Sequence, residues 1–304
     1  MPLVKYFDIV REVIDTNITR IAASKGLTPA QVYLQVVQHI RQNSAEWTSN
    51  KKPVIPYNNP LCRIAYLYSN VPANANLFEH VLRYDPELAK YITLVLASKG
   101  SLGLCAFGGG PGTELLGMAK WAEYNKYPTQ VDIEFLLLDR VNEWLDSWMA
   151  IKNVISGRYQ KAYGNAKSSW PLLISAGVFS AVDVTNITGF GNLGAIFQQD
   201  LYVMCYVISE VFDQTQDLGT FTSLMATHAP QGSKFLFIDR WGKIWTDKIK
   251  TIADQAGLAL SDFHSTRCAM SRDELVTDLG QLHTDIGISP RTTWKPFWVV
   301  GTKC

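Results

Sequence analysis

LGLCAFGGGPGTELL, residues 102–116, is the most informative segment of this chain. Its apolar first half predicts a β-strand that ends at Phe107, and the residues from Thr113 onward predict an α-helix. The glycines between them allow the backbone to turn sharply and to approach a ligand that side chains would obstruct. In an α/β sheet such a loop follows the carboxyl end of a strand, where these folds bind their ligands.

The spacing of the glycines indicates the class of ligand. Gly108, Gly110 and Gly112 follow the pattern GxGxG. Dinucleotide-binding loops require GxGxxG, and Thr113 stands where the last glycine of that pattern would fall. The loop also lacks the Gly-Lys-Ser/Thr of a P-loop. An NAD-dependent oxidoreductase is therefore the disfavoured alternative, and a ligand without phosphates fits better.

With this loop the chain resembles the class I S-adenosylmethionine-dependent methyltransferases, whose first strand is followed by GxGxG. The resemblance implies that S-adenosylmethionine is the cofactor and that four glycines bind it. These are Gly108, Gly109, Gly110 and Gly112.

Two acidic residues and one departure follow from the same resemblance. In the family an acid at the end of the second strand holds the ribose hydroxyls, which a carboxylate can accept together, and Asp139 ends the run LLLD. An acidic or polar residue after the third strand contacts the adenine amino group, which makes Asp183 the candidate. Members often carry an acid for the methionine end of the cofactor where this chain has Ala106. Another group must then make that contact, or the affinity for the cofactor is modest.

The whole chain predicts an α/β fold, with a seven-stranded, mostly parallel Rossmann-like sheet, helices on both faces and an N-terminal helical region. The predicted strands are residues 102–107, 133–138, 177–182, 201–208, 235–238, 258–264 and 294–300, the last resembling the antiparallel final strand of the family. Helix-start signals occur at Thr28-Pro29, Asn59-Pro60 and Asp85-Pro86, and residues 43–59 are predicted to form a loop. We divide the chain into a helical region (1–100), which covers the cofactor and the substrate, and a methyltransferase domain (101–304).

The end of the fourth strand supplies the candidate catalytic residues. Glu210 and Tyr206 are expected beside the transferred methyl group. Glu210 either accepts a proton, binds a substrate cation or caps the following helix. Asp239 and Arg240, after the fifth strand, are expected to pair with each other as a structural element.

The segment YLYSNVPANAN, residues 66–76, carries many polar side chains within an otherwise apolar stretch. N-terminal helices of the family often shape the substrate pocket, so this segment is expected to border it. The alternative is that its tyrosines belong to the core and its asparagines cap a helix break. The candidate substrate residues are Tyr66, Tyr68, Asn70 and Asn74.

Composition excludes several other classes. The net charge is +1, so nucleic acid is not favoured as a partner. No run of about eighteen uncharged apolar residues predicts a membrane span, and the N-terminus is not typical of a signal peptide, so we expect a cytoplasmic protein. The scattered histidines and cysteines predict no metal site and no disulfide framework. The sequence does not indicate the oligomeric state.

The methyl acceptor is not identified by the sequence. A sulfonium is already a good leaving group, so the enzyme mainly aligns the nucleophile and excludes water. Amino-methylating nucleic-acid enzymes carry Asn/Asp-Pro-Pro-Tyr/Phe after the fourth strand, where this chain has ISEV, residues 208–211. Enzymes that methylate a cytosine carbon use a Pro-Cys nucleophile, whereas Cys205 follows Met204. A small molecule or a protein side chain is favoured, and RNA is the alternative. A catalytically inactive, methyltransferase-like scaffold protein is the remaining alternative, motivated by Ala106.

Overall fold

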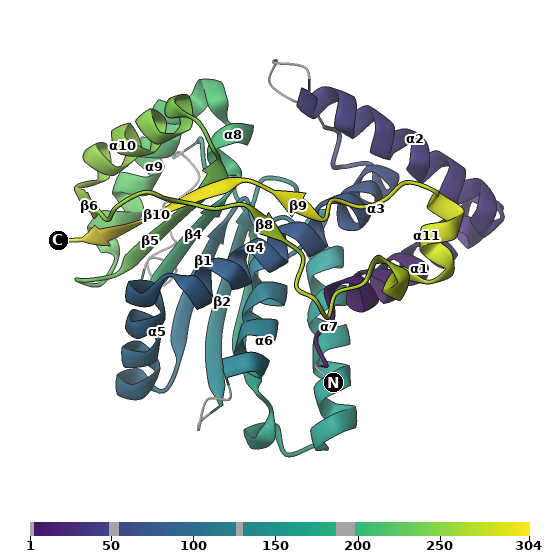
Figure 1. Ribbon diagram of the computed structural model, residues 1–304, viewed down its shortest axis with the longest axis horizontal. Helices are drawn as coiled ribbons and strands as arrows, with labels where there is room; N and C mark the ends of the chain where they lie inside the picture. The colour runs from purple at the N-terminus through teal and green to yellow at the C-terminus, as the bar shows by residue number, and fades with distance from the viewer. Residues whose placement is uncertain (1–2, 49–54, 126–129, 187–197) are drawn as a thin grey trace.

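The computed structural model describes residues 3–48, 55–125, 130–186 and 198–304. Its helices are α1 (Tyr6–Lys25), α2 (Pro29–Thr48), α3 (Pro60–Ser69), α4 (Val71–Tyr84), α5 (Pro86–Lys99), α6 (Thr113–Asn125), α7 (Trp144–Tyr163), α8 (Val207–Glu210), α9 (Thr215–His228), α10 (Lys243–Ala256) and α11 (Gln281–Ile286). Its strands are β1 (Leu102–Phe107), β2 (Val131–Asp139), β3 (Leu172–Ala181), β4 (Leu201–Cys205), β5 (Lys234–Arg240), β6 (Leu258–Leu260), β7 (His264–Ser265), β8 (Cys268–Ala269), β9 (Thr293–Trp294) and β10 (Pro296–Lys303). Figure 1 shows the main sheet as a central layer with helices packed around it, and α1, α2, α3 and α11 to one side.

The main sheet has the strand order β3-β2-β1-β4-β5-β10-β6, and β7 also pairs with β10. The pairs β1–β2, β1–β4, β2–β3 and β4–β5 are parallel, whereas β10 is antiparallel to β5. The predicted α/β fold, with its mostly parallel sheet and antiparallel final strand, is confirmed. Because β1 and β4 are adjacent while their neighbours continue in opposite directions, the order reverses between them, and this is where such sheets bind ligands.

Several predicted boundaries are wrong in detail; β3, for example, begins at Leu172, before the predicted strand 177–182. The predicted strand 201–208 ends at Cys205, because Tyr206 adopts a left-handed φ of 63° and α8 begins at Val207. The predicted strand 258–264 is divided into β6 and β7, which makes the sheet eight-stranded. The predicted loop 43–59 begins too early, because α2 continues to Thr48; residues 49–54 lie outside the described part of the chain.

Strand β1 separates two hydrophobic cores by the alternation of its side chains. Leu104 and Ala106 belong to one core, which the N-terminal helices, α6 and α7 share. Cys105 and Phe107 belong to the other core, which includes residues of α9 and α10. The N-terminal region therefore packs into the same core as the sheet.

The helix-start signals are confirmed as caps. Thr28 and Gln31 form a reciprocal capping box: the Thr28 N–H donates to Gln31 Oε1 (2.8 Å), and the Gln31 N–H donates to Thr28 Oγ1 (3.3 Å). The Asn59 side chain accepts from the Leu61 N–H at the start of α3, and Asp85 accepts from the Leu88 N–H at the start of α5. These caps fix where each helix begins, and so which residues α3 directs toward the sheet.

The segment between β7 and β10 packs against the N-terminal region. The buried Glu274 carboxylate accepts the N–H groups of Tyr6 (2.7 Å) and Phe7 (3.2 Å), the first two residues of α1. The Lys120 side chain is completely buried between Glu274 and Asp273, with Nζ 4.4 Å from the Tyr6 ring centroid. This ion-pair network joins α1, α6 and the late segment, which later supplies Arg291 to the candidate site.

Candidate active site

The glycine loop forms the floor of the site. Gly108, Gly110 and Gly112 all have positive φ, of 57°, 49° and 84°. Two features exclude a side chain at Gly112. Its positive φ disfavours other residues, and a Cβ there would lie 2.4 Å from Trp148 Cδ1. The loop is therefore held against α7 with its backbone toward the carboxyl end of β1. The close contact seen here is with Trp148, and the predicted approach to a ligand stays a prediction.

Asp139, at the end of β2, is joined to this loop. Its carboxylate accepts the Gly110 N–H on Oδ2 (2.9 Å) and the Val141 N–H on Oδ1 (2.8 Å). The residue is 8% exposed and lines a cavity together with Gly108 and Gly110. Burial raises the pKa of Asp139 to about 6, while the two backbone hydrogen bonds oppose the shift. Each carboxylate oxygen retains a lone pair that can accept a ligand hydroxyl.

Asp183 lines the same cavity beyond β3. Its Oδ1 accepts the N–H (2.9 Å) and the hydroxyl (2.6 Å) of Thr185, so it also forms the local turn that the sequence offered as an alternative. Both readings of Asp183 therefore remain open. Its Oδ2 is the atom left for a ligand.

An aromatic cluster covers this cavity. Tyr57, Tyr66 and Trp144 pack with ring centroids 5.3–5.5 Å apart, and all three line the cavity. The cavity measures about 60 Å³. The Tyr57 hydroxyl is buried with no hydrogen-bond partner among the described residues, which is costly unless a ligand supplies one. The sequence analysis missed Tyr57 and Trp144, because nothing in their local pattern marks them.

Glu114, in the first turn of α6, is a third residue that no sequence pattern marked as part of the site. It is 3% exposed, and its Oε2 has no hydrogen-bond partner among the described residues. Burial raises its pKa to about 8, and the charge of Asp139 adds to this. Its position two residues after Gly112 was the available signal. Glu114 thus places a buried carboxyl next to the glycine loop. The position at which the family often carries an acid is occupied by Ala106 in this chain.

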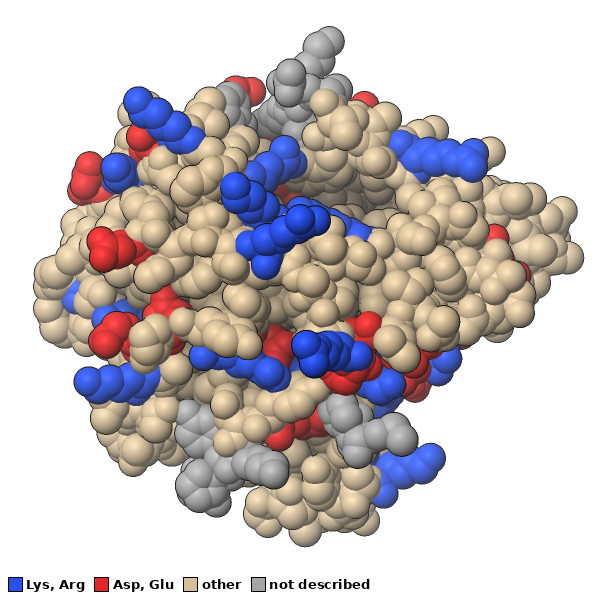
Figure 2. Space-filling view, viewed as in Figure 1, with Lys and Arg blue, Asp and Glu red and all other residues tan. Residues whose placement is uncertain are grey.

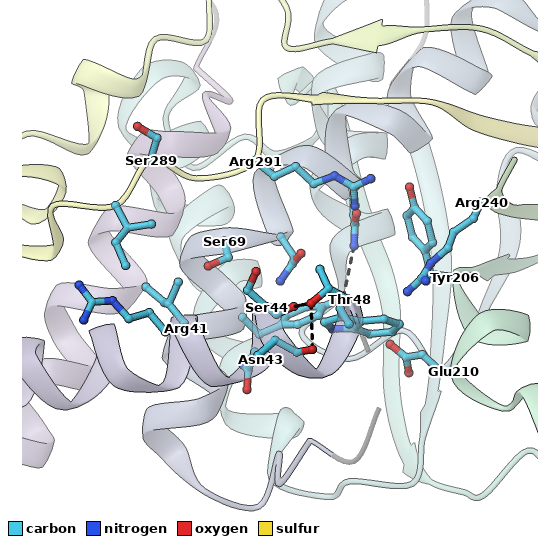
Figure 3. Close-up of a pocket in the computed structure, with 17 residues that line it drawn as sticks. Arg41, Asn43, Ser44, Thr48, Ser69, Tyr206, Glu210, Arg240, Ser289 and Arg291 are labelled. Carbon is cyan, nitrogen blue, oxygen red and sulfur yellow. Dashed lines mark hydrogen bonds between the residues drawn. The ribbon is translucent and has the colours of Figure 1, made fainter. Parts of the chain in front are cut away.

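A larger cavity adjoins the first and shares Tyr66 and Glu210 with it. It measures about 760 Å³ and lies between α2, the α3–α4 junction, the carboxyl ends of β4 and β5, and the segment before β9 (Figure 3). Figure 2 shows a hollow on this side of the molecule. Residues from both predicted regions therefore enclose it.

Most of the predicted substrate residues line this larger cavity. Tyr66, Asn70 and Asn74 do so, and the Asn74 amide donates to the Tyr66 hydroxyl (3.3 Å). Tyr68 does not, because it faces the opposite side of α3. Its hydroxyl donates to the Ile288 carbonyl (2.6 Å) and contacts His283 Nδ1 (2.8 Å), so the structure gives Tyr68 a packing position.

Tyr206 and Glu210, the candidate catalytic residues, follow β4 and line the wall of the larger cavity. Tyr206 is the only non-glycine residue with positive φ in the described part of the chain. A bulky residue in this conformation is strained, and such strain concentrates at functional sites. The strain turns the chain from β4 directly into α8. As a result, Glu210 lies in the wall shared by the two cavities.

Burial raises the pKa of Glu210 to about 8. The charge of Asp139 raises it further, whereas Arg140 and Arg240 oppose the shift. An acid of this pKa can hold or release a proton near neutral pH, which is what general acid–base chemistry requires.

The expected pairing of Asp239 with Arg240 is wrong. The Asp239 carboxylate accepts the Ser209 N–H (2.9 Å) and the backbone N–H of Arg240 (2.7 Å), and no ion pair joins the two side chains in the described structure. The Arg240 guanidinium instead lies over the Trp47 ring, 4.6 Å from its centroid, in the larger cavity. Asp239 therefore anchors α8, while Arg240 faces the site.

No family model and no curated protein matches this chain. The solved structures similar to it include a methyltransferase from Methanosarcina mazei (10% identity, 72% of this chain and 97% of that chain, TM-score 0.41). They also include a Pyrococcus horikoshii protein provisionally assigned as an RNA methyltransferase (12% identity, 72% and 84%, TM-score 0.37). A third is a mitomycin 7-O-methyltransferase (13% identity, 74% and 60%, TM-score 0.36). At these TM-scores the likeness carries no argument about the site, which depends on the residues of this chain.

The described residues contain neither a candidate membrane span nor a candidate metal site. None of its helices is both long and apolar enough to cross a membrane. No group of three or more His, Cys, Asp or Glu side chains is arranged to bind a metal ion among those residues.

Proposed function

We propose that this protein transfers a methyl group from S-adenosylmethionine to an acceptor bound in the larger cavity. The proposal is carried by the site where the carboxyl ends of the neighbouring strands β1 and β2 meet. There the Asp139 carboxylate accepts the Gly110 N–H and faces the cavity that the glycine loop lines. The glycine loop lets an adenosine approach closely, and the Asp139 carboxylate can accept its two ribose hydroxyls. The loop has no P-loop lysine that would bind phosphates.

The cofactor requires more room than the smaller cavity provides. About 60 Å³ is far below the roughly 300 Å³ or more of typical ligand pockets. We infer that the Tyr57 side chain moves when the cofactor binds. Its unpartnered hydroxyl supports this, because the arrangement without a ligand leaves a buried polar group unsatisfied. The rings of Tyr57, Tyr66 and Trp144 would then pack against the bound adenosine.

We further propose that Glu114 contacts the methionine end of the cofactor, in place of the acid that the family often carries at the position of Ala106. A buried carboxyl without a partner is stabilised as an anion by a nearby cation. The ammonium of the methionine end would supply that cation, and Glu114 lies in the first turn after the glycine loop. Glu114→Gln is expected to weaken cofactor binding while keeping the shape of the side chain.

The cofactor would supply an activated methyl group on a sulfonium. The contribution of this chain is to position the acceptor against that methyl group, to exclude water and to receive a proton. With the cofactor bound, its sulfonium would be the leaving group for the acceptor heteroatom, and the Glu210 carboxylate would accept the proton that the acceptor loses. Glu210 suits this role because it lines both cavities. Tyr206, beside it, would orient the acceptor.

The test is isothermal titration of the protein with S-adenosylmethionine, with NAD as the control ligand. The wild type is expected to bind the methyl donor and not NAD. Asp139→Asn removes the charge and one acceptor site, so it is expected to weaken binding by about tenfold or more. A wild type that binds no S-adenosylmethionine at millimolar concentration contradicts the proposal, and a scaffold role would replace it. Binding of NAD instead would indicate an oxidoreductase.

A further inference from the structure

We propose that the methyl acceptor is a small molecule carrying an anionic group, a carboxylate or a phosphate, which Arg240 and Arg291 hold beside Tyr206. This inference rests on the proposed function and narrows its substrate class. It depends on the charge, the geometry and the size of the larger cavity.

The charge of the cavity wall is strongly unbalanced. Arg41, Arg240 and Arg291 line it, and Glu210 is its one carboxylate among the described residues. No ion pair within 4.0 Å joins these three arginines to an acid in the described structure, whereas other basic residues, such as Lys120, do form such pairs. The chain as a whole has a net charge of only +1. The excess of positive charge is therefore local to this cavity, and it favours an anion there.

Two of the arginines are held in place by aromatic rings. The Arg240 guanidinium lies 4.6 Å from the Trp47 ring centroid, and that of Arg291 lies 5.7 Å from the Tyr206 ring centroid. The Arg291 backbone is also fixed, because its N–H donates to the Ser69 carbonyl (3.2 Å). The Arg291 guanidinium also hydrogen-bonds the Tyr206 side chain. A planar guanidinium carries five N–H donors, so each arginine retains donors that match the two oxygens of a carboxylate or phosphate.

Figure 3 shows how these side chains are arranged. Arg240 and Arg291 come from different elements and lie on either side of Tyr206, with Glu210 close to this group. The Arg41 side chain lies at the other end of the cavity and points away from them. An anion held by Arg240 and Arg291 would therefore place the rest of the acceptor next to Glu210. Arg41 provides a matched control within the same cavity.

The size of the cavity favours a small molecule over a polymer. Its volume of about 760 Å³ lies within the roughly 300–1,000 Å³ of small-molecule sites. Figure 2 shows Lys and Arg side chains gathered at the edge of the hollow, whereas basic and acidic side chains are mixed over the rest of this face. A nucleic-acid surface would need basic residues along a longer path. We therefore assign the arginines to an anion that enters the cavity.

The test measures the binding of three probes of similar shape at constant ionic strength: benzoate, phenyl phosphate and neutral benzyl alcohol. The wild type is expected to bind at least one anion about tenfold more tightly than the alcohol. The ratio of the affinities for benzoate and phenyl phosphate shows whether the site prefers a carboxylate or a phosphate. Arg240→Gln and Arg291→Gln are each expected to remove most of this preference. Arg41→Gln, which removes one charge from the other end of the cavity, is expected to keep most of this preference. Arg291→Lys, which keeps the charge but loses the planar fork, is expected to retain part of it.

Several results would overturn the inference. One is equal affinity for the alcohol and both anions, or no detectable binding of either anion at millimolar concentration. Another is an equal loss in Arg41→Gln and Arg291→Gln. Tighter binding of a single-stranded RNA oligonucleotide, with a steep salt dependence, would assign the arginines to nucleic acid instead. Titration with S-adenosylmethionine is run in parallel. If that cofactor binds and the anions do not, only this inference fails. If the anions bind and the cofactor does not, the methyltransferase proposal fails, and the arginines are assigned to an anion that is not a methyl acceptor.

Discussion

Replacing Glu210 with glutamine is expected to stabilise the protein without ligand, and increasingly so as the pH rises. Burial raises the pKa of Glu210 from 4.5 to about 8, so between these values the folded state retains a proton that the unfolded state releases. Unfolding then becomes easier as the pH increases, because the state that binds fewer protons is favoured. The stability linked to this proton is fully present below about pH 4.5 and is lost as the pH rises through 8.

The magnitude follows from the size of the pKa shift. Each pKa unit corresponds to 1.36 kcal/mol, so the ionised carboxylate costs on the order of 3–5 kcal/mol above pH 8. Glutamine has nearly the same shape and never ionises, so the variant avoids this cost. Other buried acids, among them Asp239, also titrate in this range, with its pKa near 6. The difference between variant and wild type is therefore the informative quantity.

The assay is urea denaturation of both proteins at several pH values from 5 to 9. The difference in the free energy of unfolding is expected to increase with pH in favour of Glu210→Gln. Glu87→Gln, at an exposed position on α5, is the control and should give a difference that does not change with pH. A pH-independent difference for Glu210→Gln would refute the reasoning, because it would mean that the carboxyl does not hold its proton in the folded protein. Methyl transfer by the same variant is expected to fall once an acceptor is known.

Three other changes test the packing around the site. Gly112→Ala is expected to lower the melting temperature and to weaken S-adenosylmethionine binding, because the new Cβ would lie 2.4 Å from Trp148 at positive φ; unchanged binding would argue against the observed loop. Tyr57→Phe is expected to raise the unfolding free energy by about 1–3 kcal/mol, since it removes an unpartnered buried hydroxyl, and denaturation with and without cofactor would show whether that hydroxyl is used. Lys120→Met leaves Glu274 buried without its cation and is expected to cost about 3–5 kcal/mol; a loss below about 1 kcal/mol would show that the network is dispensable.

The fold was largely readable from the sequence because its signals are local. The strand, the glycine loop and the helix of residues 102–116 are neighbours along the chain, and the caps at Thr28, Asn59 and Asp85 act within three residues. The apolar run of residues 102–107 predicted β1, and the alternation of strand side chains then sends Leu104 and Ala106 into one core and Cys105 and Phe107 into the other. Predicted element boundaries were wrong where the backbone conformation of a single residue ended an element within an apolar run. Tyr206, for instance, ends β4 by adopting a left-handed conformation that an apolar run does not reveal.

The sequence alone also determined which acids end the strands, because the carboxyl ends of neighbouring parallel strands meet at one edge of a sheet. Asp139 is the example: its place after β2 brought it to the glycine loop. The wall of the larger cavity was decided only by the tertiary structure. Trp47, Arg240 and Arg291 are distant in sequence, and no spacing rule relates them. Trp47 comes from α2, Arg240 ends β5, and Glu274 and Lys120 dock the late segment that carries Arg291 on α1 and α6. Such long-range packing is a property of the folded chain alone.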